Sequence, residues 1–330
     1  MTGRQSILVT GGAGFIGSHT CKALRAAGYA PVTLDNLSTG HADAVRYGPL
    51  VRGDVRDADF VKRSLRNHAC EAVIHFAGSA YVGESMANPG LYYDNNVGGM
   101  MGLLQGCAMA GVDRIVFSSS CATYGIPDSL PIRETTPLRP INPYGRSKAI
   151  CEAMLADHAT AHGLRYAALR YFNAAGADPD GELSERHDPE THLLPLALRA
   201  ASGQGGPLHV LGTDYPTPDG TCIRDYIHVA DLARAHVRAL AHLLAGQDSL
   251  VVNLGTGVGL SIRQILAAIE RLSGAPVPVV WQPRRPGDPP ALVADPLYAK
   301  ATLGFAAELS SLPTILAHAA PGFGLHLQEA

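Results

Sequence analysis

Two side chains four residues apart, Tyr144 and Lys148, have the residue types of an acid–base pair. On a helix this spacing places both on one face. An ammonium group beside a phenol favours the phenolate, so a group that titrates near pH ~10 can become a usable base. A serine run precedes them, and we expect the hydroxyl of its last member, Ser120, to hold a substrate oxygen. The pattern Tyr-x-x-x-Lys is common by chance, so its weight depends on a cofactor site elsewhere in the chain.

Such a site is predicted at the start of the chain. Residues 6–10 form a short apolar, β-branched run that indicates a buried strand, residues 11–17 are rich in glycine, and residues 18–28 have a helical pattern. A helix that begins after such a turn faces phosphates with free N–H groups and the positive end of its dipole. Strand, glycine turn and helix together predict dinucleotide binding.

Each glycine of this turn has an expected task. We expect Gly11 to permit the tight turn, Gly14 to let the backbone approach a pyrophosphate, and Gly17 to allow close packing of helix on strand. The second strand, 31–34, ends at Asp35, whose carboxylate suits ribose hydroxyls and repels a 2′-phosphate, so NAD is favoured over NADP. Asn36 could bond the ribose or cap the following turn.

Composition limits the class of protein. The 330 residues are 46% hydrophobic and 17% charged, which is typical of a globular chain with ample core, and the formal net charge of −3 gives no reason to expect nucleic acid or a membrane surface as a partner. We expect no membrane span and no signal peptide. The six cysteines have no Cys-x-x-Cys spacing and are expected to be reduced thiols of a cytoplasmic protein.

No metal site is expected. The fourteen histidines show no metal-ligand grouping, and His158 and His162, four apart on a predicted helix, are interpreted as a solvated face.

Strands and helices alternate up to about residue 170. Further strands are predicted at 49–52, 72–76, 114–117 and 165–169, and helices at 57–67, 89–111 and 143–162. This alternation predicts an α/β fold of the Rossmann type, a doubly wound parallel sheet whose ligands bind at the carboxyl ends of the strands. We assign residues 1–175 to an NAD-binding domain.

The second half is predicted to form a smaller, mixed α/β substrate lobe over 176–330. It contains a strand at 208–211, a helix at about 229–245 and a loop-like stretch at 278–295. The strand at 250–253 is expected to return to the main sheet, so that the chain crosses back once.

With these motifs in place, the chain resembles the extended short-chain dehydrogenase/reductase family and, within it, the UDP-glucose 4-epimerases. The resemblance covers roughly nine tenths of the chain, and its motifs are specific when taken together. Beyond the glycine turn and the catalytic residues it rests on these segments: His75-Phe76-Ala77-Gly78, Val82 to Ser85, Tyr92 to Val97, Leu169 to Asn173, Asp219 to Thr221, Arg224 to Val229, Asn253 to Gly257, and Arg284-Arg285 with Gly287-Asp288.

The resemblance implies a catalytic role for three residues. Tyr144 would remove the proton of the sugar 4-hydroxyl as hydride leaves C4 for the nicotinamide, and Ser120 would hydrogen-bond the same oxygen. Lys148 would bond the nicotinamide ribose and lower the pKa of the tyrosine. The 4-keto sugar would then turn over and take the hydride back on its other face, interconverting UDP-galactose and UDP-glucose.

It also implies two sets of binding residues. Residues expected to hold NAD are Gly11, Gly14, Phe15, Ile16, Gly17, Asp35, Asn36, Asp54, Val55, Phe76, Ala77, Gly78, Asn95, Ser118, Tyr144, Lys148 and Tyr171. Residues expected to hold the UDP-sugar are Ser120, Tyr144, Asn173, His192, Leu193, Leu211, Arg224, Tyr226, Arg285, Asp288 and Leu292.

Four positions depart from the family pattern. Ala80 stands where many members have a lysine that reaches the cofactor, and Leu211 replaces an aromatic residue that packs on uracil. Thr191-His192-Leu193 replaces Asn-Asn-Leu, which puts one diphosphate contact in doubt. Leu292 stands where residue size is taken to decide whether N-acetylated sugars fit, so we expect UDP-glucose and UDP-galactose as main substrates and poor turnover of the N-acetyl pair.

Other functions would use parts of the same pattern. A UDP-pentose 4-epimerase (xylose/arabinose) or a UDP-N-acetylhexosamine 4-epimerase would share the chemistry. A sugar-nucleotide dehydratase needs a further acid and base, usually an Asp-Glu pair, where this chain has Cys121-Ala122. A nucleotide-sensing regulator would not need Ser120, Tyr144 and Lys148.

A homodimer is expected. The helices predicted at 89–111 and 143–162 carry apolar residues beyond one core face, which suits a four-helix bundle between subunits. These residues are Met100, Met101, Leu103, Leu104, Met154 and Leu155.

Overall fold

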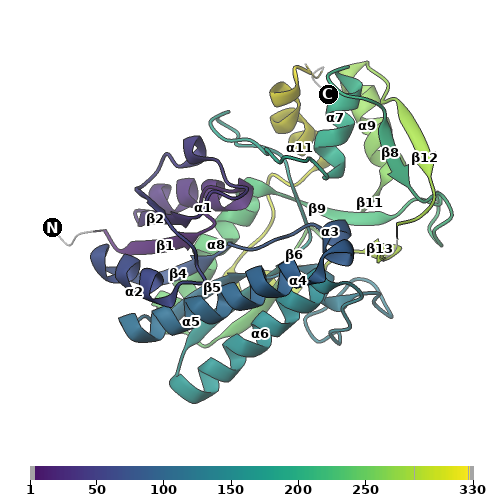
Figure 1. Ribbon diagram of the computed structural model, residues 1–330. Helices are drawn as coiled ribbons and strands as arrows, with labels where there is room; N and C mark the ends of the chain where they lie inside the picture. The colour runs from purple at the N-terminus through teal and green to yellow at the C-terminus, as the bar shows by residue number, and fades with distance from the viewer. Residues whose placement is uncertain (1–3, 286, 326, 328–330) are drawn as a thin grey trace.

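The computed structural model describes residues 4–285, 287–325 and 327, and Figure 1 shows their arrangement. A seven-stranded sheet has the order β10-β6-β5-β4-β1-β2-β3, and each neighbouring pair is parallel. This order confirms the predicted doubly wound sheet, with β10 as a seventh strand. The strands are β1 (Ser6–Thr10), β2 (Ala30–Asp35), β3 (Leu50–Arg52), β4 (Cys70–His75), β5 (Arg114–Ser118), β6 (Arg165–Tyr171) and β10 (Leu250–Leu254).

Helices cover both faces of this sheet and bury its apolar side chains in two clusters. The cluster on one face joins Leu24 to Leu240, and the cluster on the other joins Val61 to Leu103. The first face is covered by α1 (Phe15–Ala26), α8 (Val229–Leu244) and α10 (Leu297–Leu303). The second face is covered by α2 (Ala58–Asn67), α5 (Gly98–Ala110) and α6 (Pro143–His162), of which α5 and α6 run side by side in Figure 1.

Two helices differ from their predicted bounds. The first begins at Phe15, within the glycine-rich segment 11–17, rather than at residue 18. The predicted helix 89–111 is divided into α4 (Pro89–Tyr92), a π-helical turn (Tyr93–Val97) and α5. Such a turn re-aims the side chains within it. Here it buries Asn96, whose amide donates to Ser79 O at 3.0 Å and to Ser147 Oγ at 2.9 Å, and so ties the turn to α6.

The second part of the chain forms a smaller α/β lobe, at the upper right in Figure 1. In it β9 pairs with β7, β11 and β13, while β8 and β12 form a separate parallel pair. Its strands are β7 (Asn173–Ala175), β8 (Leu208–Leu211), β9 (Ile223–His228), β11 (Gly259–Ser261), β12 (Val279–Gln282) and β13 (Ala291–Leu292). Its helices are α7 (Leu193–Ala201), α9 (Ile262–Ser273), α11 (Leu312–Ala319) and the 3₁₀ turn Ala320–Phe323.

The prediction of a loop over 278–295 was wrong in two places, because β12 and β13 lie within it. Prolines on either side of the Val-Val-Trp run masked its β-propensity, and both strands form only by pairing with distant partners.

The chain returns to the main sheet as predicted, but more than once. The strand near 250–253 is β10, and α8 and α10 also pack on the sheet, so the expected single crossing was too few. The division at residue 175 stays a prediction.

Among the described residues no helix is both long and apolar enough to cross a membrane. The remaining short elements are α3 (Val82–Ala87) and the 3₁₀ turns Ala42–Ala44 and Cys121–Tyr124.

Most of the residues chosen for a dimer contact lie in the chain's own core. Met100, Leu103, Leu104 and Leu155 are at most 2% exposed because they pack under α5 and α6 against the sheet. Met101, in contrast, is 51% exposed. The homodimer therefore stays a prediction that rests on fewer residues.

Candidate active site

The sharp start of helix α6 positions Tyr144 and Lys148. Pro143 occupies the first turn, and the side chain of Asn142 caps the helix by accepting a hydrogen bond from Gly145 N at 2.8 Å. Tyr144 and Lys148 follow on the first two turns, and both are buried. The predicted tyrosine–lysine pair is thus fixed at the start of a 20-residue helix.

Ser120 reaches the same place from the sheet. It follows β5 and caps the 3₁₀ turn Cys121–Tyr124, where its Oγ accepts from Ala122 N at 3.2 Å. Helix α6 packs tightly on this turn, since a Cβ at Gly145 would lie 2.3 Å from Ala122 O. Only a glycine allows this approach, and it brings Tyr144 next to Ser120, whose hydroxyl acts on the pKa of the phenol.

The protonation states of the pair differ from the sequence expectation. Burial raises the pKa of Tyr144 well above its usual range, and neighbouring Tyr171 raises it further, while the Ser120 hydroxyl opposes them. Burial lowers the pKa of Lys148 to about 8. The Lys148 ammonium donates to Ser118 O at 2.8 Å, and lowering of the tyrosine pKa by Lys148 is not seen in the protein alone.

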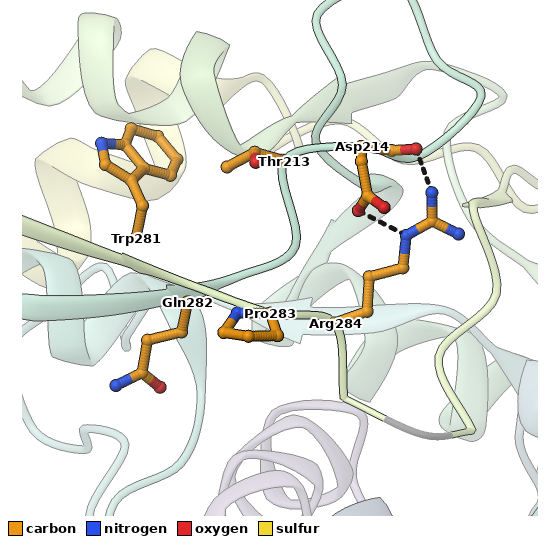
Figure 2. A pocket seen from close by; sticks show the side chains of 6 residues that line it. All are labelled: Thr213, Asp214, Trp281, Gln282, Pro283 and Arg284. Carbon is orange, nitrogen blue, oxygen red and sulfur yellow. Dashed lines mark hydrogen bonds and ion pairs between the residues drawn. The ribbon is translucent and has the colours of Figure 1, made fainter.

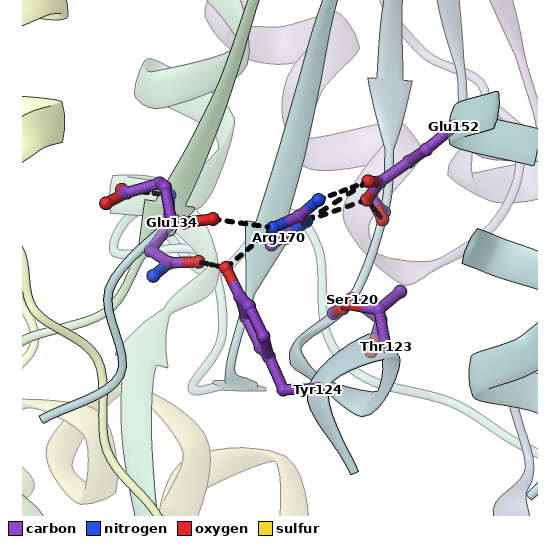
Figure 3. Close-up of polar contacts among 8 residues, drawn as sticks. Ser120, Thr123, Tyr124, Glu134, Glu152 and Arg170 are labelled. Carbon is purple, nitrogen blue, oxygen red and sulfur yellow. Dashed lines mark hydrogen bonds and ion pairs between the residues drawn. The ribbon is translucent and has the colours of Figure 1, made fainter. Parts of the chain in front are cut away.

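A buried polar network lies behind the serine turn (Figure 3). Glu152, one turn beyond Lys148 on α6, forms an ion pair with Arg170 of β6, with Nη2 and Oε2 2.5 Å apart. Ser119 Oγ donates to the same carboxylate at 2.5 Å, and Arg170 Nη1 donates to Tyr124 OH at 2.9 Å. Helix, strand and serine turn are therefore held by one charged centre.

The network extends to β10 and the loop before α6. Tyr124 OH donates to Asn253 Oδ1 at 2.7 Å, and Asn253 N donates to Glu134 Oε1 at 2.8 Å. Sequence reasoning missed these residues, because a lone Glu, Arg or Tyr at a strand or helix has no distinguishing pattern. An arginine in an otherwise apolar strand, such as Arg170 near the end of β6, is the one signal that could have indicated a buried partner.

The glycine turn has the geometry that a pyrophosphate requires. Gly11 has a φ of 70°, and a Cβ there would lie 2.6 Å from Ala77 N. A Cβ at Gly17 would lie 2.2 Å from Gly11 O, whereas at Gly14 the nearest atom is 3.3 Å away. Helix α1 has no side-chain cap and no acidic residue in its first turn, so its N–H groups stay available. The residues fit NAD as predicted.

Asp35 holds the cofactor turn from the end of β2. Its Oδ2 accepts from Ala13 N at 3.0 Å and its Oδ1 from Leu37 N at 2.8 Å. Beyond it, Asp54 pairs with Arg56 at 2.7 Å, which lowers the pKa of Asp54 to about 2, and Asn36 Nδ2 lies 3.4 Å from Asp54 Oδ2. Asp35, Asn36 and Asp54 therefore form one polar group after β2 and β3.

The other predicted cofactor residues line the carboxyl ends of the strands. Gly78 follows β4, and a Cβ there would lie 3.7 Å from Lys148 Nζ. Tyr171 OH lies 2.8 Å from Ser118 Oγ, and Asn95 Nδ2 donates to Ser79 Oγ at 2.9 Å. The remaining predicted residues have apolar side chains that pack against the sheet's core clusters or, for Phe15, against the His19 ring: Phe15, Ile16, Val55, Phe76 and Ala77.

On the substrate side, the lobe brings Leu292 against the serine turn. Leu292 of β13 is paired in register with Arg224 of β9, and it packs in a buried cluster with Cys121 and Phe172. Arg224 is partly buried, and its Nη1 donates to Ile223 O at 2.8 Å. Asn173 of β7 is paired with Tyr226 of β9, whose side chain is buried in the lobe.

Arg285 and Asp288 form a two-bond pair. Nε and Nη2 of the arginine each lie 3.0 Å from a carboxylate oxygen of Asp288, and Gly83 of α3 lies opposite the guanidinium. Leu211, at the end of β8, is paired in register with Gln282, which lines a cavity of about 400 Å³, but Leu211 itself is not part of the cavity wall. Figure 2 shows that cavity, whose walls include no residue predicted for the site: Thr213, Asp214, Trp281, Gln282, Pro283 and Arg284.

His192 and Leu193 mark the start of α7, but His192 is engaged with another residue. Its Nδ1 makes a short hydrogen bond with Glu185 Oε1. Glu185, His187, Glu190 and His192 bring their ligand atoms together, so the expectation of no metal-ligand grouping among the histidines was wrong. The sequence pattern did not indicate this grouping, because its members are unevenly spaced in a segment that has no helix or strand.

Comparisons with known proteins agree with this geometry. A family model described as the NAD dependent epimerase/dehydratase family matches residues 7–255. A UDP-glucose 4-epimerase of Rhizobium meliloti (strain 1021) is 52% identical over 301 residues, which are 91% of this chain and 92% of that protein.

Two solved structures are similar over nearly their whole length. The UDP-glucose 4-epimerase from Brucella ovis in complex with NAD has 59% identity and a TM-score of 0.95, with 98% of this chain and 100% of that chain covered. The UDP-glucose-4-epimerase from Stenotrophomonas maltophila with bound NAD and formylated UDP-arabinopyranose has 39% identity and a TM-score of 0.92, with 96% and 97% covered. The chain therefore belongs to the NAD-dependent epimerase/dehydratase family, among the UDP-glucose 4-epimerases.

Proposed function

We propose that this protein is an NAD-dependent UDP-glucose 4-epimerase, which interconverts UDP-galactose and UDP-glucose. The observation that carries the proposal is the meeting of Tyr144, Ser120 and Lys148 at the carboxyl end of β5, beside a glycine turn that fits a pyrophosphate. The similarity to UDP-glucose 4-epimerases over nine tenths of the chain supports the same assignment.

In this function Tyr144 accepts the proton of the sugar 4-hydroxyl and later returns it. Ser120, which already acts on the tyrosine hydroxyl, hydrogen-bonds the same sugar oxygen and orients it. When bound, NAD supplies the hydride acceptor and a positive charge near the phenol. Lys148, with a pKa of about 8, is charged at pH 7 and keeps donors free beyond its bond to Ser118 O.

The protein must also hold the UDP part while the sugar turns over. Arg224 lies on β9 and Arg285 in the loop between β12 and β13, and guanidinium groups bind phosphate oxygens in pairs. Asp288 already orients Arg285, so little side-chain freedom is lost on binding. We assign Asn173, His192, Leu193, Leu211, Tyr226 and Leu292 to the same substrate site, and the residues of the cofactor turn to NAD.

The alternative chemistry of a dehydratase has no acid–base pair in the serine turn. Burial raises the pKa of Cys121 to about 12, so its thiol stays neutral, and Ala122 has no functional group. A UDP-pentose 4-epimerase stays the second candidate, because a pocket discriminates weakly against a smaller substrate and the Stenotrophomonas maltophila structure holds a UDP-arabinopyranose derivative.

We further propose that the protein is a cytoplasmic homodimer. All six cysteines are unpaired and five are buried, which suits a reducing compartment. Exposed Met101 and Met109 on α5 supply apolar surface for the contact between subunits. A monomeric mass by light scattering at micromolar concentration would contradict the dimer.

The test is proton NMR of UDP-galactose incubated with the purified protein and no added cofactor. Appearance of the UDP-glucose anomeric signal is the expected result and shows that NAD is carried by the protein. Conversion only after NAD is added would mean a loosely held cofactor, as Ala80 suggests. No conversion in either tube, with UDP-xylose epimerised instead, would replace the hexose with the pentose substrate.

A further inference from the structure

A second set of ligand atoms lies outside the catalytic residues, in the segment between β7 and α7. Glu185, His187, Glu190 and His192 each offer one carboxylate oxygen or ring nitrogen, and these atoms lie within 4.8 Å of one another. Two imidazoles and two carboxylates are a donor set that zinc accepts. Calcium and magnesium prefer oxygen ligands alone.

Two separations within the set match the edges of a coordination tetrahedron, while His192 Nδ1 and Glu185 Oε1 are closer, in the short hydrogen bond that a bound ion would replace. His187 Nδ1 lies 3.4 Å from Glu185 Oε1 and 3.5 Å from Glu190 Oε2. Ligands placed ~2.0–2.1 Å from a tetrahedral zinc ion are about 3.4 Å apart. Within the described part of the chain, His187 Nδ1 and Glu190 Oε2 are buried and have no hydrogen-bond partner. The two atoms face each other at ion-pair distance without a hydrogen bond, which leaves both available to an ion between them.

Backbone groups aim the buried carboxylate of Glu190 at the other ligands. Its side chain is only 1% exposed, and one oxygen, Oε1, accepts from Thr191 N at 2.8 Å and from His192 N at 2.9 Å. These two bonds fix the carboxylate and leave Oε2 facing His187. Orientation of a ligand by hydrogen bonds to its other atom is typical of metal sites.

Aromatic rings support the histidines, and one side of the set is open. The His187 ring meets Phe15 and Tyr81 edge-on, at 6.3 and 5.9 Å between centroids, and it lies 4.9 Å from the His192 ring. The His192 side chain is 42% exposed, which gives an ion a route from solvent. The four ligand side chains are thus held in place and partly shielded from solvent, and an ion can reach them from the side of His192.

We propose that Glu185, His187, Glu190 and His192 bind one divalent transition-metal ion, with zinc as the preferred ion. A bound ion would cross-link the segment before α7, because its ligands span eight residues that have no helix or strand of their own. Binding does not depend on the proposed function. Its effect on catalysis does, because His192 and Leu193 then lie in the substrate site.

The test uses the full-length protein without a polyhistidine tag, stripped with a chelator and titrated with cobalt(II). The expected result is about one cobalt per chain with the intense visible absorption of four-coordinate cobalt, which zinc then displaces. Zinc is also expected to raise the melting temperature of the wild type. Absence of the absorption band, or a six-coordinate spectrum that zinc does not remove, overturns the proposal.

Variants locate the ion. His187→Gln and His192→Gln are expected to weaken cobalt binding by at least ~10-fold, and His192, whose side chain is 42% exposed, can be replaced without unfolding the protein. Glu182→Gln is the matched control, because Glu182 belongs to a nearby carboxylate group already paired with Lys22 at 2.8 Å. Binding that survives both histidine changes, or that is lost only with Glu182→Gln, contradicts the assignment.

Discussion

The Lys148 ammonium donates a hydrogen bond of 2.8 Å to the carbonyl oxygen of Ser118, and this bond joins the catalytic helix to the end of β5. The lysine is buried, and its ammonium nitrogen lies 4.9 Å from the centroid of the Phe117 ring. Its position is therefore fixed before any ligand binds, while its remaining donors face the cofactor residues.

From this position we predict that Lys148→Met lowers kcat and also weakens retention of NAD. The methionine keeps the apolar stem but removes the ammonium donors that would bond the nicotinamide ribose. The expected loss in kcat is on the order of 10²-fold. Turnover is measured by a coupled assay for UDP-glucose, and bound NAD by absorbance after denaturation. Unchanged values of both would contradict the role given to the lysine.

The buried pair Arg170–Glu152 is predicted to be a stability determinant. Arg170→Met leaves the Glu152 carboxylate without its partner in a site that is 7% exposed, and we expect a loss of about 3–5 kcal/mol in the free energy of unfolding. The double variant with Glu152→Gln should recover part of that loss. Urea unfolding of the single and double variants measures the difference, and equal stabilities for both would contradict the account.

Leu292 is predicted to limit the sugar pocket. It is 5% exposed and packs beside Cys121, next to the catalytic serine. Leu292→Ala should raise kcat/KM for UDP-N-acetylglucosamine relative to UDP-glucose by about 10-fold, because the removed atoms make room for the acetyl group. The ratio of the two values is the readout, since it is insensitive to a loss of stability. Comparable turnover of both substrates by the wild type would refute the prediction.

Stability is predicted to fall as pH decreases from about 7 to 5. Burial lowers the pKa of His75 to about 3 and of His236 to about 4, below their value of ~6.5 in the unfolded chain. Below ~6.5 the unfolded state binds protons that the folded state does not, so the stability present above that pH is lost. The expected fall is ~1–2 kcal/mol for each histidine.

A variant isolates the contribution of His236. Phenylalanine at this position of α8 packs against Phe76 without a titrating group, so His236→Phe should show a smaller fall in unfolding free energy between pH 7 and 5. The exposed His209→Gln variant serves as the control and should fall as the wild type does. A fall in His236→Phe equal to that of the wild type would contradict the assignment.

The fold and much of the site follow from local sequence patterns. The strand–glycine–helix start, the alternation of strands and helices, and the Tyr144–Lys148 spacing each depend on residues close together in the chain, and each is confirmed as a feature of the fold. Gly145, which lies between Tyr144 and Lys148 in the sequence, has a further role that only the structure shows. Its missing Cβ lets α6 approach the serine turn.

What could not be predicted depends on contacts between distant segments. The strands β12 and β13 form by pairing with β8 and β9, and the Arg170–Glu152–Tyr124 network joins residues with no shared pattern. The pKa of Tyr144 was expected to be lowered by its charged neighbour, but the burial that the fold imposes is the larger effect.

The central claim is that Tyr144 carries the proton of the sugar hydroxyl, and kcat of Tyr144→Phe tests it most directly. The substitution removes one oxygen from a buried side chain that packs against Tyr92, so the fold and the bound NAD should be retained. We predict a kcat reduced by about 10²–10⁴-fold with UDP-galactose. A variant that retains its NAD and turns over within about threefold of the wild type would show that another group moves the proton.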